Sequence, residues 1–467
     1  MEGKNIVTID LGTQKLGLAI ATDEGKGQIK LVCYNEFPSD GISRGKVLNP
    51  SKLSVALRTA LESTERFLNL KINEAMVNIQ KYDIREISVE SGIDISEGRC
   101  ITTEDIDNLE NMVWTEAKDN ASQGEDVLGV VAQAYDADNE INVGAKDIVG
   151  MMAEHLKGHY KAYLGKSSYH NNIEAAFNAA GIRIVRPVFI PARIGECVLT
   201  PSEMESGVAL MDIGAGGSSV SVFYNGTMRH YGAIPFGGNS ITGDIRNLCG
   251  IDEHLAENIK MGYGGLMPDK LASLGEKTLK ITDTASGSRV EITAKYLSEI
   301  ITARTREILE ALLYEIQLSG YADRLKNGVV VCGGCANMLN LCNMIKEISG
   351  YNARVGAPSR KQFDAESSFF TAGAVTTAGL IKHFMGEKSN ACTEATEEPV
   401  PENAPDLNEL FKEEQIKQEP APKVENKENK EPRQPRVTVT REPKNKRPWK
   451  DLGSLLFGQD DDDDNQL

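Results

Sequence analysis

The sequence lacks the features that would place this chain in a membrane, outside the cell or on a nucleic acid. No apolar run reaches the roughly 18 residues that a membrane-spanning helix needs, so any membrane contact is expected to be peripheral. No secretory signal opens the chain and its eight cysteines are scattered, so we expect reduced thiols and a cytoplasmic protein. The net charge of −17 argues against a general nucleic-acid binder, which would usually be basic.

A complete set of zinc ligands is also missing. Cys332 and Cys335 have the spacing of half a zinc site, but a structural zinc ion would need a second Cys or His pair at matching spacing. Cys342 is the nearby candidate, and no histidine stands close to it. We interpret Cys332 and Cys335 as small side chains that fill a tight turn between a strand and a helix.

What the sequence does contain is two segments, about 200 residues apart, that read almost alike: residues 7–20 and residues 209–222. Each is an apolar run that ends in Asp (Asp10 and Asp212), then a turn rich in Gly, Ser or Thr, then a second β-prone run. We predict two hairpins whose tips expose backbone N–H groups to an anion, because glycine permits close approach. Such a repeat indicates a duplicated, two-lobed protein that holds nucleotide phosphates between its halves.

A third glycine element follows a buried strand predicted over residues 329–332. The pair Gly333 and Gly334 comes next, and we expect a helix from Met338 whose N-terminus faces a sugar or phosphate. Each of the three loops alone is explained by an ordinary tight turn. Together, in this order and each at a strand end, they favour a nucleotide site. The two Asp residues add carboxylates beside which a hydrated Mg²⁺ ion would fit.

The composition changes beyond about residue 386, where Pro, Glu, Lys, Gln and Asn dominate and indicate a disordered linker. A short amphipathic helix with a basic start is predicted after it, typical of an interfacial membrane anchor. Its apolar residues are Trp449, Leu452, Leu455, Leu456 and Phe457. Residues 460–464 are all Asp and would repel anionic headgroups. From the residues alone, a partner-binding or self-docking helix is an equal alternative.

In order and context, the three glycine loops resemble the phosphate-1, phosphate-2 and adenosine motifs of the actin/sugar-kinase/DnaK superfamily. Within it, the chain is similar to the FtsA family of bacterial cell-division proteins over about residues 4–385. Residues 234–245, 257–264 and 364–380 carry the narrower match. The resemblance implies an α/β, actin-like, two-lobed duplicated fold of ribonuclease-H type with an FtsA-type 1C insert, followed by a disordered linker and a short amphipathic helix.

The resemblance also implies boundaries for the parts of the chain. In chain order these are lobe-one core 1A (residues 1–82), the inserted subdomain 1C (83–163), the second part of 1A (164–205), lobe-two core 2A (206–225), subdomain 2B (226–305), the second part of 2A with the inter-lobe helix (306–385), the linker (386–445), the membrane-targeting helix (446–458) and an acidic tail (459–467).

Carried over position by position, the roles of the family assign the site. Asp10 and Asp212 would hold Mg²⁺ through water. The residues expected to bind ATP are Gly12, Thr13, Lys15, Gly214, Gly216, Gly217, Glu257, Lys260, Gly333 and Gly334. The first six of these would bind the β- and γ-phosphates from two sides, and the last four would lie at the adenosine end. An ammonium group beside a phosphate loop suits Lys15 independently.

Two departures from the family pattern bear on catalysis. In the phosphate-2 loop, Ala215 replaces a usual glycine and Ser219 stands where a second Asp is usual. The connecting helix normally begins Glu-Pro, but here Ile190 precedes the proline. Because that carboxylate helps orient the attacking water, we expect tight Mg-ATP binding with hydrolysis weak or absent, and we assign no catalytic residue.

The implied function is an ATP-binding cell-division protein that polymerises on the cytoplasmic face of the membrane at the division site. It would tether filaments of FtsZ through the C-terminal tail of FtsZ and recruit other division proteins, with no nucleic-acid partner. A small-molecule kinase of the same fold would need an acid or base at Ile190 and would not need the tail. A pilus-assembly ATPase shares the core and the insert, but the long linker and terminal Trp helix argue against it. A chaperone ATPase would need a substrate-binding β-domain after residue 385.

Overall fold

The computed structural model describes residues 5–23, 28–79, 81–96, 99–271, 277–282, 289–385 and 391–394. All of these belong to one compact unit, Met1–Glu397. The helix predicted to carry Trp449, Leu452, Leu455, Leu456 and Phe457 lies outside the described residues, as do the acidic tail and all of the linker except residues 391–394. Within the described part of the chain, no helix has both the length and the apolar character needed to cross a membrane.

The two predicted hairpins are present, and each starts a sheet. The first pairs β1 (Asn5–Leu11) with β2 (Lys15–Asp23), and the second pairs β13 (Val208–Ile213) with β14 (Ser218–Tyr224), both antiparallel. We call the parts built on these sheets lobe one and lobe two.

The two sheets share one strand order. Lobe one adds β3 (Ile29–Pro38), β7 (Glu74–Asn78), β12 (Arg183–Val188) and β20 (Phe363–Asp364) in the order β12-β7-β1-β2-β3-β20. Lobe two adds β15 (Thr227–Ile234), β18 (Val329–Cys332) and β19 (Ala353–Val355) in the order β19-β18-β13-β14-β15. Read in this direction, its five strands match the first five of lobe one, and β20 is additional. In both, the first hairpin strand pairs in parallel with the next strand along the sheet. The repeated order supports the predicted duplication.

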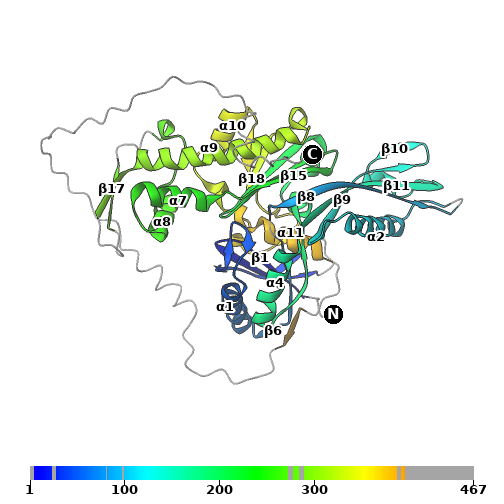
Figure 1. Ribbon diagram of the computed structural model, residues 1–467, viewed down its shortest axis with the longest axis horizontal. Helices are drawn as coiled ribbons and strands as arrows, with labels where there is room; N and C mark the ends of the chain where they lie inside the picture. Colours follow the sequence, from blue (N-terminus) through cyan, green and yellow to red (C-terminus); the bar gives the residue numbers. More distant parts are fainter. Residues whose placement is uncertain are drawn as a thin grey trace, which may run out of the picture. The chain divides into compact units, whose positions relative to one another are not determined.

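Helices cover both faces of the lobe-one sheet, and Figure 1 shows α1 and α4 together beside β1. On β1, Val7 and Ile9 share a core with Leu53 of α1, whereas Ile6 joins the core of Ile194 and belongs to the other face. Alternate residues of a strand point to opposite faces, so burial on both faces explains why most of this run is apolar. The helices involved are α1 (Pro50–Leu68), α4 (Ser167–Ala180), α5 (Pro191–Val198) and α11 (Val375–Phe384).

Lobe two has its own large core beneath α9, the longest helix in Figure 1. On β13, Met211 packs in this core, while Leu210 faces the core shared with lobe one. The two lobes are therefore joined by apolar packing. The helices of this part are α6 (Pro201–Ser206), α7 (Gly238–Cys249), α8 (Glu253–Tyr263), α9 (Ala294–Leu318) and α10 (Leu341–Ser349).

An insert between β7 and β12 forms a separate four-stranded sheet in the order β10-β9-β11-β8, with its own core. Its helix α2 begins with a capping box, in which Thr102 and Asp105 each bond to the backbone of the other, a standard N-terminal signal. The elements are β8 (Ile84–Asp94), α2 (Thr103–Asp119), β9 (Glu125–Ala137), β10 (Glu140–Val143), α3 (Ala145–Ile148) and β11 (His155–Lys166).

Three short strand pairs lie outside these sheets. These are β4 (Ile42–Ser43) with β5 (Lys46–Val47), β16 (Thr278–Thr282) with β17 (Arg289–Thr293), and β21 (Cys392–Glu394) with β6 (Leu70–Ile72).

The helix expected from Met338 was placed wrongly. A 3₁₀ turn, η3 (Gly334–Asn337), follows the glycine pair, and α10 begins only at Leu341. Met338 is extended, and Asn340 has a φ of 69°, so the chain turns twice before helical geometry begins. The N-terminus of α10 therefore does not directly follow the glycine pair, as had been expected for a helix that faces a sugar or phosphate.

Within the insert, His159 is held between two carboxylates on neighbouring strands. Its Nδ1 lies 3.0 Å from Glu90 Oε1 and its Nε2 lies 2.7 Å from Asp136 Oδ2. Lys157 also pairs with Glu90, at 2.5 Å. Burial lowers the pKa of His159, but the bonds to the two carboxylates outweigh burial and raise its pKa above the ordinary value.

Because of this raised pKa, the stability of the insert is expected to fall as the pH rises. The protonated ring stabilises the folded state fully below the unfolded pKa, and this contribution is lost as the pH passes through the folded pKa. His159→Asn should flatten the fall in melting temperature between about pH 6 and pH 8. His254→Asn, at an exposed position on α8, is the matched control. Identical pH profiles for the wild type and His159→Asn would contradict the assignment.

Candidate functional site

The carboxyl ends of the central strands of both lobes meet at one cavity of about 370 Å³, within the usual range for ligand pockets. All the residues predicted to bind nucleotide or metal line it: Asp10, Gly12, Thr13, Lys15, Asp212, Gly214, Gly216, Gly217, Glu257, Lys260, Gly333 and Gly334. The structure thus brings together residues from four separate stretches of the sequence. What they bind stays a prediction.

The two hairpin tips touch across the cavity. A Cβ atom on Gly216 would lie 2.3 Å from Thr13 Oγ1 and 2.9 Å from the Cα of Arg44. A second contact crosses between the lobes, where Gln14 Nε2 donates to Asn239 Oδ1 at 2.8 Å. Position 216 therefore has no room for a side chain, and the separation of the tips depends on this glycine.

Asp10 and Asp212 lie close enough to affect each other. Burial raises the pKa of Asp10 to about 7, the ammonium of Lys81 opposes this rise, and the charge of Asp212 adds to it. Asn78 Nδ2 donates to Asp10 Oδ1 at 3.0 Å, and Asn78 Oδ1 accepts from Leu11 N at 2.7 Å. Asn78 thereby fixes both the carboxylate and the strand end that carries it.

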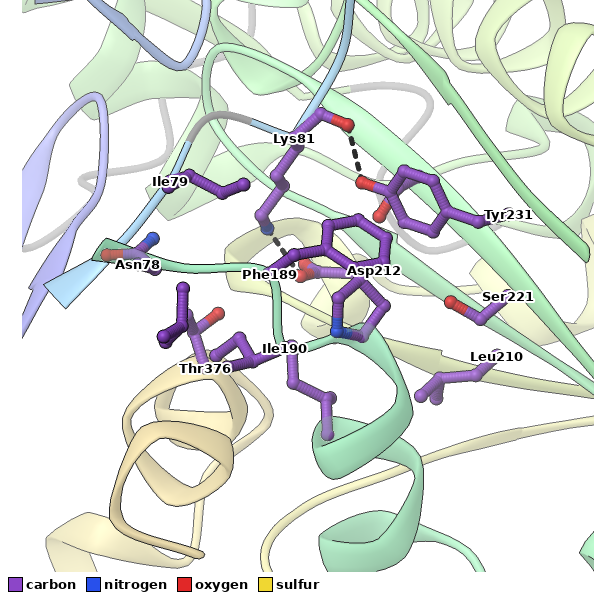
Figure 2. A pocket seen from close by; sticks show the side chains of 14 residues that line it. Asn78, Ile79, Lys81, Phe189, Ile190, Leu210, Asp212, Ser221, Tyr231 and Thr376 are labelled. Atoms are coloured by element: carbon purple, nitrogen blue, oxygen red, sulfur yellow. Dashed lines mark hydrogen bonds and ion pairs between the residues drawn. The ribbon is translucent and has the colours of Figure 1, made fainter. Parts of the chain in front are cut away.

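Lys81 is the main site residue that the sequence did not reveal. Its Nζ forms an ion pair with the carboxylate of Asp212 (Figure 2). It would also lie 3.7 Å from a Cβ on Gly214. Burial lowers the pKa of Lys81, but Asp212 and Asp10 outweigh burial and raise it. Lys81 follows the end of β7, which runs parallel to β1. This position after a predicted strand was the one indication in the sequence that Lys81 could lie near Asp10.

The two carboxylates fit a magnesium ion. Mg²⁺ is commonly held by one or two carboxylates together with water and phosphate oxygens, and Asp10 and Asp212 supply that number. In the described part of the chain, no cluster of three or more His, Cys, Asp or Glu side chains forms a metal site. A magnesium ion here would therefore depend on a bound phosphate to complete its ligands. Lys81 presently places a positive charge beside Asp212.

Lys15 lies at the exposed side of the cavity. Its Nζ pairs with Glu36 Oε2 at 2.5 Å, and its side chain is 66% exposed. The hydroxyl of Tyr34 donates to Glu36 Oε1 at 2.9 Å. The positive charge expected at the first phosphate loop is thus partly neutralised by Glu36, which the sequence did not single out.

Lys260 and Glu257 form a hydrogen-bonded wall at the other end. Lys260 Nζ donates to Gly238 O at 3.2 Å, Thr242 Oγ1 at 2.9 Å and Glu257 Oε2 at 2.7 Å. An ammonium group has three donors, so all three are used. The structure places Lys260 as the group that holds Glu257, while Glu257 faces the cavity.

The two glycines of the third element differ in their surroundings. Gly333 has a φ of +87°, and a Cβ there would lie 2.5 Å from Asp212 Oδ1, so a larger residue would displace the carboxylate. Gly334 has no atom within 4 Å of its Cβ position and leaves open space in the cavity.

A second, smaller cavity of about 30 Å³ adjoins Lys81 and Asp212 (Figure 2). Two of the residues that depart from the family pattern, Ser219 and Ile190, line it. Asp212 is the one carboxylate among its lining residues. The position where an acid would orient water is apolar here.

Comparison with known proteins shows similarity to one family. A family model described as "Cell division protein FtsA" matches residues 209–378. FtsA of Neisseria meningitidis is 29% identical over 354 residues, which cover 76% of this chain and 84% of that protein. FtsA of Escherichia coli is 24% identical over 395 residues, covering 82% and 92%. Over most of its length, the chain is similar to cell-division proteins of the FtsA family.

The fold was also compared with solved structures. A chain of the "PilM-PilN type IV pilus biogenesis complex" superposes with a TM-score of 0.55 over 81% of this chain and 98% of its own length, at 14% identity. That likeness shows an actin-like α/β fold. The span that the FtsA model matches begins in β13 and includes the second hairpin, Glu257, Lys260 and the Gly333 turn. The first hairpin and Lys81 lie outside that span, and their place in the cavity comes from the structure.

Proposed function

We propose that this chain is an FtsA-family protein that binds Mg-ATP between its lobes. The observation that carries the proposal is the convergence of both hairpin tips, both strand-end carboxylates and Lys81 on one cavity. Backbone N–H groups at glycine-rich tips suit phosphate oxygens. Asp10 and Asp212 would hold the metal, and Lys15 and Lys81 would meet the phosphates from the exposed and the buried side.

The adenosine would lie toward the third glycine element. Gly334 leaves open space there, and Glu257 offers a carboxylate fixed by Lys260. A fixed carboxylate is a suitable acceptor for ribose hydroxyl groups. We therefore assign Glu257 to the ribose and give Lys260 the role of positioning it.

Hydrolysis is proposed to be weak or absent. The smaller cavity beside Lys81 is lined by Ile190 and Ser219 where a water-orienting acid would be expected. A missing general base reduces the rate of phosphoryl transfer without removing the groups that bind phosphate. This also disfavours the alternative of a small-molecule kinase, which would need such a group.

In the cell, we propose that the protein polymerises on the cytoplasmic face of the membrane at the division site. It would tether FtsZ filaments through the C-terminal tail of FtsZ, docked on residues 226–305, and recruit other division proteins. The FtsA relatives named as cell-division proteins support this assignment. The pilus-complex neighbour supports the fold alone at 14% identity.

Membrane binding is proposed to depend on the segment that begins near Arg447. Deleting all residues after Arg447 is expected to abolish co-sedimentation with anionic liposomes, because Trp449 and the following leucines would form the apolar face. A chain ending at Gly458 lacks the acidic tail alone and should sediment at least as well as the full chain. If the protein ending at Arg447 sediments like the full chain, the anchor lies elsewhere.

A further inference from the structure

Tyr231 of β15 connects lobe two to the segment that carries Lys81. Its hydroxyl donates to the backbone carbonyl of Lys81 at 2.5 Å (Figure 2). Its side chain is 8% exposed, and Ser219 also hydrogen-bonds to its hydroxyl. A buried tyrosine hydroxyl usually has such a partner. Here the partner is the residue whose ammonium meets Asp212.

Lys81 is therefore held by lobe two at both ends. Its carbonyl bonds to Tyr231 and its Nζ pairs with Asp212, although Lys81 itself belongs to the connection between β7 and β8 in lobe one. A lysine side chain is long and flexible. Fixing its backbone restricts the places that the ammonium can reach when Asp212 takes a different partner.

The ring of Tyr231 is itself fixed by two aromatic neighbours. Its centroid lies 5.0 Å from that of Phe189 and 6.2 Å from that of Tyr163, and both contacts are edge-on. Phe189 and Tyr163 stack at 4.4 Å. Edge-on and offset-stacked rings stabilise one another beyond the area they bury. The hydroxyl of Tyr231 is consequently held in one position.

Hydrogen bonds from the insert hold β15 as well. Gln133 Nε2 donates to Met228 O at 3.0 Å, and Arg229 Nη1 donates to Gln133 O at 2.8 Å. Lys161 Nζ donates to Arg229 O at 2.7 Å. These contacts precede Tyr231 by two or three residues along β15, so the anchor of Lys81 rests on a strand with little freedom to shift.

We propose that Tyr231 is a positioning residue for the terminal phosphate of bound nucleotide, because it fixes the backbone from which Lys81 reaches that phosphate. The proposal rests on nucleotide binding at the cavity. Mg²⁺ at Asp212 would release the ammonium of Lys81, and the nearest new partner at that buried end is the phosphate farthest from the adenosine. Tyr231 would thus increase the preference for a nucleoside triphosphate over a diphosphate.

The test is the ratio of the dissociation constants of ADP and ATP, measured with Mg²⁺ by isothermal titration calorimetry on the full chain. Tyr231→Phe removes one hydroxyl and keeps the ring. It is expected to lower the ADP/ATP ratio by about tenfold, the size of one hydrogen bond to a well-placed group, with little change for ADP. Lys81→Met should lower the ratio at least as much, and the double variant should not lower it further than Lys81→Met.

Tyr160→Phe is the matched control. The hydroxyl of Tyr160 is buried and donates to that of Tyr135 at 3.2 Å inside the insert, not to Lys81, so its removal should leave the ratio unchanged. Melting curves check that the variants are folded. A Tyr231→Phe ratio equal to that of the wild type, or an equal fall in Tyr160→Phe, would overturn the proposal. A wild type that binds neither nucleotide would instead overturn the proposed function.

Discussion

Replacing Asp212 by asparagine is expected to lower the affinity for Mg-ATP by about 100-fold and to remove its dependence on magnesium. Asparagine keeps the shape of the side chain and an oxygen for Lys81, but it loses the charge that would hold the metal. In the wild type, Lys81 pairs with Asp212. In Asp212→Asn, the affinity for metal-free ATP should therefore rise relative to the affinity for Mg-ATP.

Asp244→Asn provides the control for Asp212→Asn, because it removes the same charge from lobe two outside the cavity. Asp244 pairs with Arg304 at 2.6 Å on the side of α9 and should not affect nucleotide binding. Calorimetry with and without magnesium distinguishes the two variants. Wild-type affinity and magnesium dependence in Asp212→Asn would contradict the assigned metal site.

Gly216→Ala is expected to weaken ATP binding by about 10- to 100-fold while the chain stays folded. The added Cβ would lie 2.3 Å from Thr13 Oγ1 and 2.9 Å from a backbone atom of Arg44. The neighbour is the opposite lobe, so the clash is relieved by separating the hairpin tips. Tips that are too far apart no longer reach the same phosphates.

Gly243→Ala is the matched change for this second prediction. Gly243 lies within α7 with no atom within 4 Å of its Cβ position, and alanine favours a helix over glycine. This variant should bind ATP like the wild type and melt at the same or a higher temperature. Equal ATP affinities for the two glycine variants would show that contact between the tips does not shape the site.

The hairpins could be predicted because their signal is local. An apolar run, a terminal Asp and a glycine turn lie within a few residues of one another, and burial on both faces of β1 and β13 requires the apolar runs. The same local signal placed Asp10 and Asp212 at the strand ends. Their convergence then follows from the duplicated strand order, which the resemblance implied and the structure shows.

Other parts of the site have no local signal. Asn78 and Lys81 reach the carboxylates because β7 lies beside β1, and apart from their position at the end of a strand, the residues around them do not mark that approach. The donors of Lys260 are filled by Gly238 and Thr242 of α7 and by Glu257 of its own helix, and the two contacts to α7 depend on how the helices pack. The helix after Gly334 was placed three residues early, since the left-handed conformation of Asn340 is not required by its sequence.

The central claim is that the two hairpins and their carboxylates form one site for Mg-ATP. Isothermal titration of the full chain with ATP, in magnesium and in a chelator, tests it most directly. We predict one nucleotide per chain, bound in magnesium and much more weakly in the chelator. Failure to bind ATP at millimolar concentration in magnesium, or an affinity that the chelator leaves unchanged, would contradict the account.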